Sequence, residues 1–186
     1  MNINLPLQTY LSQRSCDIFK KWERFMMQSV DFWLTDSIWH TQQHSARVMF
    51  YNLILADRLQ LDSNQCEQLA TCSVFHDTRR LDEGLDKGHG LRAAKYYKTS
   101  CLKHGLLYND TVAYIMAYHD QDDNEAQASF KSELQDPEKA LYLYKIFKDA
   151  DALDRYRLGS GALNVNFLRN EQSLDLIELA QYLNDV

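Results

Sequence analysis

Histidines and aspartates recur along the chain in a pattern that suits binding of a divalent metal ion. His44 lies in the segment His-Ser-Ala-Arg-Val, the pair His76-Asp77 follows an apolar run, and Asp151 lies in Lys-Asp-Ala-Asp-Ala-Leu-Asp. Neutral imidazoles and ionised carboxylates are ligands for borderline and hard divalent ions. Two of each, with coordination positions left for water, make the open kind of site that supports catalysis. Such an ion would polarise a phosphoryl oxygen and lower the pKa of a bound water.

Further histidines extend this set. His89 follows Asp-Lys-Gly, His119 precedes a polar stretch, and His40 lies four residues before His44. We expect His89 and His119 to hold a second ion or to transfer protons; capping of helix ends is the alternative for both. His40 is expected on the same helical face as His44, where it either touches the site or is exposed to solvent. His104, before a glycine, is expected to end a helix.

Three arginines are candidates for binding a phosphate group. Arg79 and Arg80 follow the His-Asp pair directly, and Arg92 lies one helical turn beyond His89. The guanidinium group presents forked donors that match the oxygens of a phosphate. The alternative for the adjacent pair is an ordinary solvated loop.

The spacing of apolar residues predicts the helices that must bring these side chains together. Expected helices cover residues 17–34, 38–60, about 63–75, 89–103, 109–119, 137–158 and about a dozen residues after a cap at 173. Residues 79–88 and 120–127 are expected to be polar loops, and Gly159-Ser160-Gly161 a break. Most candidate ligands then lie at helix ends, where side chains from several helices can converge. Asp149 and Asp154 share the helix of Asp151 but point elsewhere, so we expect them at the surface or supporting the ligands.

Composition indicates an all-α protein with one domain over residues 1–186. Apolar residues make up 45% of the chain, whereas glycine (6) and proline (2) are too scarce for a turn-rich β-fold. The formal net charge is −6, and no basic stripe is present, which argues against extended nucleic-acid binding. The four cysteines are widely spaced and are expected to be reduced, packed thiols.

Location and assembly are also matters of expectation. Residues 1–15 lack a basic region followed by an apolar core, and no apolar run approaches about 20 residues. We therefore expect a cytoplasmic protein without membrane contact. The aromatic-rich segment 22–33 is expected in the core or at the contact of a homodimer.

Four segments, taken in order, resemble the HD superfamily of metal-dependent phosphohydrolases. The segments HSARV, FHDTRR, DKGHGLRAA and FKDADALD span most of residues 40–158. The resemblance implies a compact bundle of about six to seven helices, with helical extensions at both ends. It also implies one or two divalent ions (Mn, Co, Ni, Fe, Mg or Zn) held by His44, His76, Asp77 and Asp151. In branches with two metals, His89 and His119 match the additional ligands, and Asp77 would bridge the ions.

The resemblance leaves the substrate open. No Gly-Tyr-Pro follows His119, so the cyclic-di-GMP phosphodiesterase branch is not indicated, and Arg79-Arg80 replace the Glu-Asp pair of alarmone hydrolases. We expect hydrolysis of a phosphomonoester, phosphodiester or phosphoanhydride in a small molecule, with a nucleotide as the first expectation. Two alternatives remain: a di-iron oxygenase of the same superfamily, and a non-catalytic module that binds a nucleotide or a protein partner.

Overall fold

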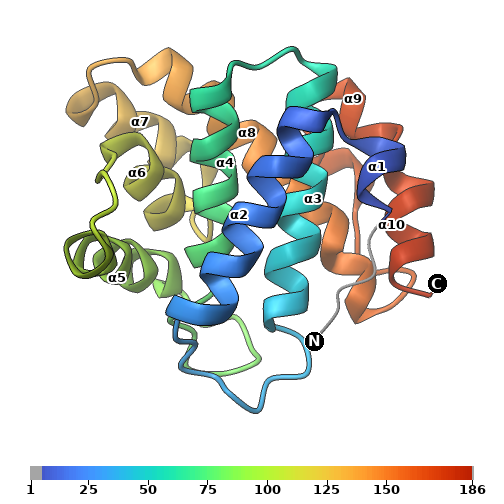
Figure 1. Ribbon diagram of the computed structural model, residues 1–186, viewed down its shortest axis with the longest axis horizontal. Helices are drawn as coiled ribbons and strands as arrows, with labels where there is room; N and C mark the ends of the chain where they lie inside the picture. The colour runs from blue at the N-terminus through green and yellow to red at the C-terminus, as the bar shows by residue number, and fades with distance from the viewer. Residues whose placement is uncertain (1–5, 186) are drawn as a thin grey trace.

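The computed structural model describes residues 6–185 and contains helices joined by loops, with no strand in that range (Figure 1). The expected all-α class is confirmed. The expectation about a leader peptide falls on residues 1–15, and residues 1–5 of that segment lie outside the described range. No helix in residues 6–185 has the length and apolarity needed to cross a bilayer.

The helices are α1 (Leu7–Tyr10), α2 (Gln13–Ser29), α3 (Gln42–Arg58), α4 (Ser63–Phe75), α5 (His89–His104), α6 (Asp110–Tyr118), α7 (Asp123–Glu133), α8 (Pro137–Leu153), α9 (Glu171–Leu174) and α10 (Ile177–Leu183), with 3₁₀ turns η1 (Asp154–Leu158) and η2 (Val165–Phe167).

The centre of the bundle is formed by α3 and α4, which pack against each other and against α2 and α8 (Figure 1). Both central helices are buried on most sides, including the uninterrupted stretches 48–56 and 68–75. A helix that is apolar on nearly every side belongs in the interior of a bundle. Polar side chains on α3 and at the end of α4 are therefore forced into the core, and His44 and His76 are both fully buried.

Helices α5 and α6 pack closely side by side and form the flank of the bundle with α7 (Figure 1). Gly90 in the first turn of α5 allows this approach. A Cβ at that position would overlap the carbonyl oxygen of Met116 and lie 2.8 Å from Nδ1 of His119. The close packing brings the start of α5, at His89, to the end of α6.

Helix starts follow the side chains that cap them. Asp62 and Gln65 form a reciprocal capping box at α4, the Asn109 side chain accepts from the N–H of Val112 at α6, and Asp136 caps α8 with Pro137 as the first helical residue. These starts agree with the expected ones. The first long helix, α2, begins after Ser12 and ends at Ser29, earlier at both ends than expected.

Three expectations for the C-terminal half are wrong. The stretch expected as a loop over 120–127 contains the start of α7, because Asp122 caps it and Ala126 and Phe130 bury one face. The helix expected to reach residue 158 changes from α to 3₁₀ geometry at Asp154. Ser173 does not cap a long last helix; it lies within α9, and its hydroxyl donates to Asp149 at 2.9 Å. The break at Gly159 is confirmed by its φ of 125°.

Candidate metal centre

The four residues first singled out come together in the core, and their donor atoms face one another. Nε2 of His44 lies 3.0 Å from Nε2 of His76 and 3.4 Å from both Oδ2 of Asp77 and Oδ1 of Asp151. Nε2 of His76 lies 3.8 Å and 3.7 Å from the same two oxygens. Ligands at about 2.1 Å from a shared ion are separated by roughly 3.0–3.5 Å. The donor atoms of His44, His76 and Asp151 are close enough together to share one ion, and Oδ2 of Asp77 lies beside them. These four residues are called the first ligand group.

Three helices position the first ligand group. His44 lies in the first turn of α3, where Thr41 caps the helix and accepts from the His44 backbone N–H at 3.3 Å. The α4 helix ends at Phe75, so the adjacent His76 and Asp77 can both turn inward. Asp151 lies in the last turn of α8, and its side chain is 30% exposed. The site is thus buried on the α3 and α4 side and open at Asp151.

A second ligand group shares Asp77 with the first. Oδ1 of Asp77 lies 3.0 Å from Nε2 of His89 and 3.8 Å from Nε2 of His119, and these two nitrogens are 2.8 Å apart. Asp77 therefore presents Oδ2 to one group and Oδ1 to the other. The carboxylate has the geometry of a bridge between two ions.

The outer nitrogens of these imidazoles are held by oxygen atoms. A hydrogen-bond acceptor at Nδ1 fixes the proton there, orients the ring and leaves Nε2 as the metal-binding atom. The Nδ1 partners are Asp154 Oδ2 at 2.7 Å for His44, Ser73 O at 2.9 Å for His76, Asp86 O at 2.9 Å for His89 and Met116 O at 2.7 Å for His119. Every inward-facing nitrogen is thus available as a ligand. Asp154 supports a ligand, and it is fully buried rather than at the surface.

The pKa values of the two core histidines are shifted in opposite directions by burial and by neighbouring charges. Burial and the charge of Arg157 oppose protonation of His44, but hydrogen bonds to three neighbouring carboxylates outweigh them and raise its pKa to about 9. Burial dominates at His76 and lowers its pKa to about 3. Burial also opposes ionisation of Asp77 and Asp151, yet the surrounding imidazoles hold both pKa values below the usual range. Both carboxylates are therefore ionised near neutral pH.

His40 reaches the site from a different place than expected. The α3 helix begins only after Thr41, so His40 precedes the helix instead of sharing a helical face with His44. Its Nδ1 lies 2.6 Å from Oδ2 of Asp77, and the residue is 8% exposed. His40, His44 and Asp77 also lie close enough together to share an ion. His40 therefore belongs to the surroundings of Asp77.

Two of the three candidate phosphate-binding arginines are engaged elsewhere. The guanidinium group of Arg79 lies 3.3 Å from the ring centre of Tyr96 and 5.1 Å from that of Trp33. Arg92 donates to both carboxylate oxygens of Asp86 at 2.6 Å and to the carbonyl of Arg79 at 3.0 Å. These contacts tie the loop after α4 to α5. Phosphate binding by these arginines stays a prediction.

Arg80 lies closer to the ligands. Its Nη1 is 3.7 Å from Oδ1 of Asp77 and 3.3 Å from Nε2 of His89, while Nη2 donates to the carbonyl of Gly84. The residue is 6% exposed. Arg80 therefore contributes positive charge directly beside the second ligand group.

A cavity of about 440 Å³, the metal-side cavity, opens onto both ligand groups. Three of the cations that line it come from the end of α8 and from η1: Lys148, Arg155 and Arg157. Sequence reasoning did not single them out. Their signal was available, because Lys148 precedes Asp151 by three residues and Arg155 follows it by four, the spacing of one helical face.

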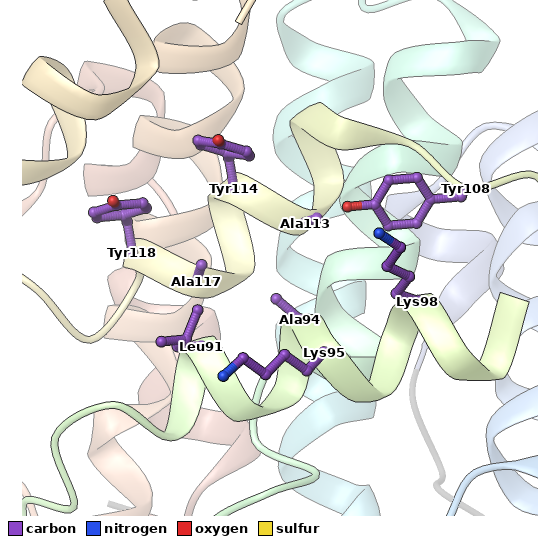
Figure 2. A pocket seen from close by; sticks show the side chains of 9 residues that line it. All are labelled: Leu91, Ala94, Lys95, Lys98, Tyr108, Ala113, Tyr114, Ala117 and Tyr118. Atoms are coloured by element: carbon purple, nitrogen blue, oxygen red, sulfur yellow. The ribbon is translucent and has the colours of Figure 1, made fainter. Parts of the chain in front are cut away.

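A separate and more apolar pocket of about 250 Å³ lies between α5 and α6. Figure 2 shows Leu91 and Ala94 of α5 facing Ala113 and Ala117 of α6, with Tyr108 beside Lys98 at one end; Tyr114 and Tyr118 of α6 also line the pocket. The residues lining it include neither histidine nor carboxylate. We therefore assign the chemistry to the metal-side cavity.

Searches of protein-family models, of curated proteins and of solved structures find no match for this chain. The helical bundle and the buried histidine and aspartate groups are compatible with an HD-type domain.

Proposed function

We propose that this protein is a metal-dependent phosphohydrolase of the HD type that acts on a small phosphorylated molecule, with nucleotides as the favoured class. One observation supports this most directly: two ligand groups joined by Asp77 open onto a cavity lined by four cations, Arg80, Lys148, Arg155 and Arg157. A cavity that combines cationic side chains with candidate metal ligands suits an anionic phosphate group.

The donor set fits a divalent metal. Two pairs of imidazole nitrogens face each other at 3.0 Å and 2.8 Å, although their Nδ1 protons are already committed to oxygen acceptors. At this distance two such nitrogens share either a proton, as a hydrogen bond, or a metal ion. The carboxylates of Asp77 and Asp151 add the negative charge that makes a divalent ion a better occupant than a proton. His44, His76, Asp77 and Asp151 would hold one ion, and Asp77, His89 and His119 a second.

A bound ion would supply Lewis-acid polarisation of the phosphoryl group and a water of lowered pKa. The chain itself supplies charge and orientation. Nε of Arg155 donates to the carbonyl of Ala162 at 3.0 Å, and this bond directs the guanidinium along the cavity wall. Lys148 donates to the carbonyl of Gln121 at 3.1 Å, and burial lowers its pKa. The guanidinium of Arg155 can neutralise charge that develops on the phosphate oxygens, whereas Lys148 lies 3.3 Å from Asp123 and contributes less charge.

The test is metal content and phosphatase activity with and without His76→Ala plus Asp77→Ala. We expect the wild-type chain to bind one or two ions and to hydrolyse phosphorylated metabolites with Mn²⁺, Co²⁺, Ni²⁺ or Mg²⁺, and the double variant to lose both properties. His104→Ala is a matched control, because His104 ends α5 outside both ligand groups. If the double variant fails to fold, Asp151→Asn replaces it in the same measurements, because Asp151 is a partly exposed candidate ligand. Equal metal and equal activity in all variants would end the proposal.

A di-iron oxygenase is the second candidate, because Asp77 and the two histidine pairs provide ligands for two ions. Iron stoichiometry and oxygen consumption during turnover distinguish it from a hydrolase. The four cations of the metal-side cavity favour the hydrolase, since they match an anionic substrate. Nucleotide binding without turnover across all these metals would instead indicate a regulatory module.

A further inference from the structure

A second hollow of about 350 Å³, the side compartment, adjoins the metal-side cavity. The two share four wall residues, His119, Lys148, Asp151 and Arg155. The rest of the side compartment is formed by Ala152, Ala162, Leu163, Asn164, Phe167 and Arg169. A molecule whose phosphate lies at the metal ligands can therefore extend past Lys148 and Arg155 into this compartment.

The outer wall of the side compartment is fastened to the helix that bears Asp151. The buried carboxylate of Asp149 accepts from the backbone N–H of Arg169 at 2.9 Å, the N–H of Asn170 at 2.8 Å and the hydroxyl of Ser173 at 2.9 Å. These bonds hold the segment after η2 against α8. They anchor the chain two residues after Phe167, which is the kind of support that a recognition surface needs.

The cations nearest the wall are already neutralised, so the side compartment itself offers little free charge. Arg169 donates from Nε to Asp123 at 2.8 Å and lies 3.5 Å from Asp149 through Nη1. Lys148 lies 3.3 Å from Asp123. The compartment is therefore unsuited to a second phosphate group.

What the side compartment does offer is an aromatic surface beside an amide. Phe167 is 66% exposed although it lines the compartment, and Leu163, Ala152 and Ala162 add apolar surface. Oδ1 of Asn164 accepts from the N–H of Asn166 at 3.1 Å, which leaves the amide N–H₂ of Asn164 as a donor. An exposed ring next to a directional donor suits a planar group with hydrogen-bond acceptors.

We propose that the side compartment binds the leaving group of the substrate, and that this group is a nucleoside whose base stacks on Phe167. The role as a leaving group rests on the proposed phosphohydrolase function, whereas nucleoside binding does not. The compartment thereby narrows the substrate to nucleoside monophosphates over phosphorylated sugars and polyols.

The experiment compares adenosine, guanosine, cytidine and uridine 5′-monophosphates with glycerol 3-phosphate, which has the same phosphate but no base. Binding is measured calorimetrically in EDTA, so that no turnover occurs. We expect at least one nucleotide to bind about tenfold tighter than glycerol 3-phosphate, and Phe167→Ala to remove most of this preference, because the base would lose its stacking partner. Phe167→Tyr should restore it.

Tyr182→Ala is the matched control, because Tyr182 is a 75% exposed aromatic residue on α10 that lines neither hollow. The inference is overturned if no nucleotide is preferred over glycerol 3-phosphate, or if Phe167→Ala keeps the preference. A preference that depends on Phe167, in a protein without phosphatase activity under any metal, would leave the binding site standing and refute the proposed hydrolysis.

Discussion

The carboxylate of Asp77 is approached by imidazoles from both sides and is 5% exposed. His40 and His44 face Oδ2, while His89 faces Oδ1. A buried carboxylate is costly unless it is paired and hydrogen-bonded, and this one is paired in several directions. So many ionisable groups in the interior lower the stability of the fold unless they bind a ligand such as a metal ion. The cluster around Asp77 is therefore the best candidate for the functional site.

At the same scale, Asp154 sets the affinity of the first ligand group. Its Oδ2 accepts from Nδ1 of His44 at 2.7 Å, while its carboxylate also accepts from Arg47. We predict that Asp154→Asn weakens binding of Mn²⁺ or Zn²⁺ by about 10–100-fold, the usual effect of losing a carboxylate that supports a metal-bound imidazole. Competition with a chromogenic chelator measures the dissociation constant.

Asp175→Asn is the control for this loss of charge, because the Asp175 side chain is 74% exposed and remote from the ligands. An Asp154→Asn protein that binds metal as tightly as Asp175→Asn would show that the contact to His44 has no supporting role.

Among the elements, α8 and its continuation η1 organise the whole site. Asp151 supplies a ligand, Asp149 holds the wall of the side compartment, and Asp154 orients His44. Lys148 and Arg155 line both hollows. Because η1 directly continues α8, the candidate ligand Asp151, the supporting carboxylates and the neighbouring cations keep constant relative positions.

The packing of α5 on α6 decides whether the second ligand group exists. We predict that Gly90→Ala forces these helices apart, because its Cβ would overlap the carbonyl of Met116 and crowd His119. Overpacking of this kind costs about 1–3 kcal/mol. Melting should therefore occur roughly 2–10 °C lower, and the second ion should be lost before the first in a metal titration.

Gly161→Ala is the matched control, since nothing lies within 4 Å of a Cβ at that position. The Gly90→Ala variant could instead melt at the same temperature as Gly161→Ala and bind as many ions as the wild-type chain. In that case the close approach of α5 and α6 is not what positions His89 and His119.

Across the whole fold, the metal ion that we propose would compete with a proton bound in the core. The metal-free protein holds a proton on His44, whose pKa is raised to about 9, above its ordinary value of 6.5. The stabilisation from that proton is fully present below pH 6.5 and is lost as the pH rises through 9. A metal ion must displace the proton, so its apparent affinity rises over the same interval.

We therefore predict that Mn²⁺ stabilises the fold more at pH 8.5 than at pH 6.5. At a concentration of about 100 times the dissociation constant, the melting temperature should rise by roughly 5–10 °C. Thermal melts at fixed Mn²⁺ across this range, each paired with an EDTA sample, measure the difference. His104→Ala should behave as the wild-type chain. A metal-induced shift that is constant or shrinks with rising pH contradicts this competition.

Local patterns in the amino-acid sequence were sufficient for the all-α class and for helix starts such as those at Asp62, Asn109 and Asp136, whereas the candidate ligands were chosen from segments spread over residues 40–158. The class and the helix starts depend on residues within a few positions of one another, either as apolar periodicity or as a cap. A helix with little buried apolar surface was missed: α7 has only two buried residues, Ala126 and Phe130, too few to reveal a helical period.

Only the tertiary structure decided which side chains meet. His44 and Asp154 are separated by 110 positions yet lie 2.7 Å apart, and Arg79 lies against the ring of Tyr96 instead of facing the cavity. Such contacts depend on which helix faces pack together and at what distance. No short segment of the sequence specifies which helix faces meet, because the packing depends on residues from several helices together. Close contacts such as the one at Gly90 allow only one arrangement of those helices.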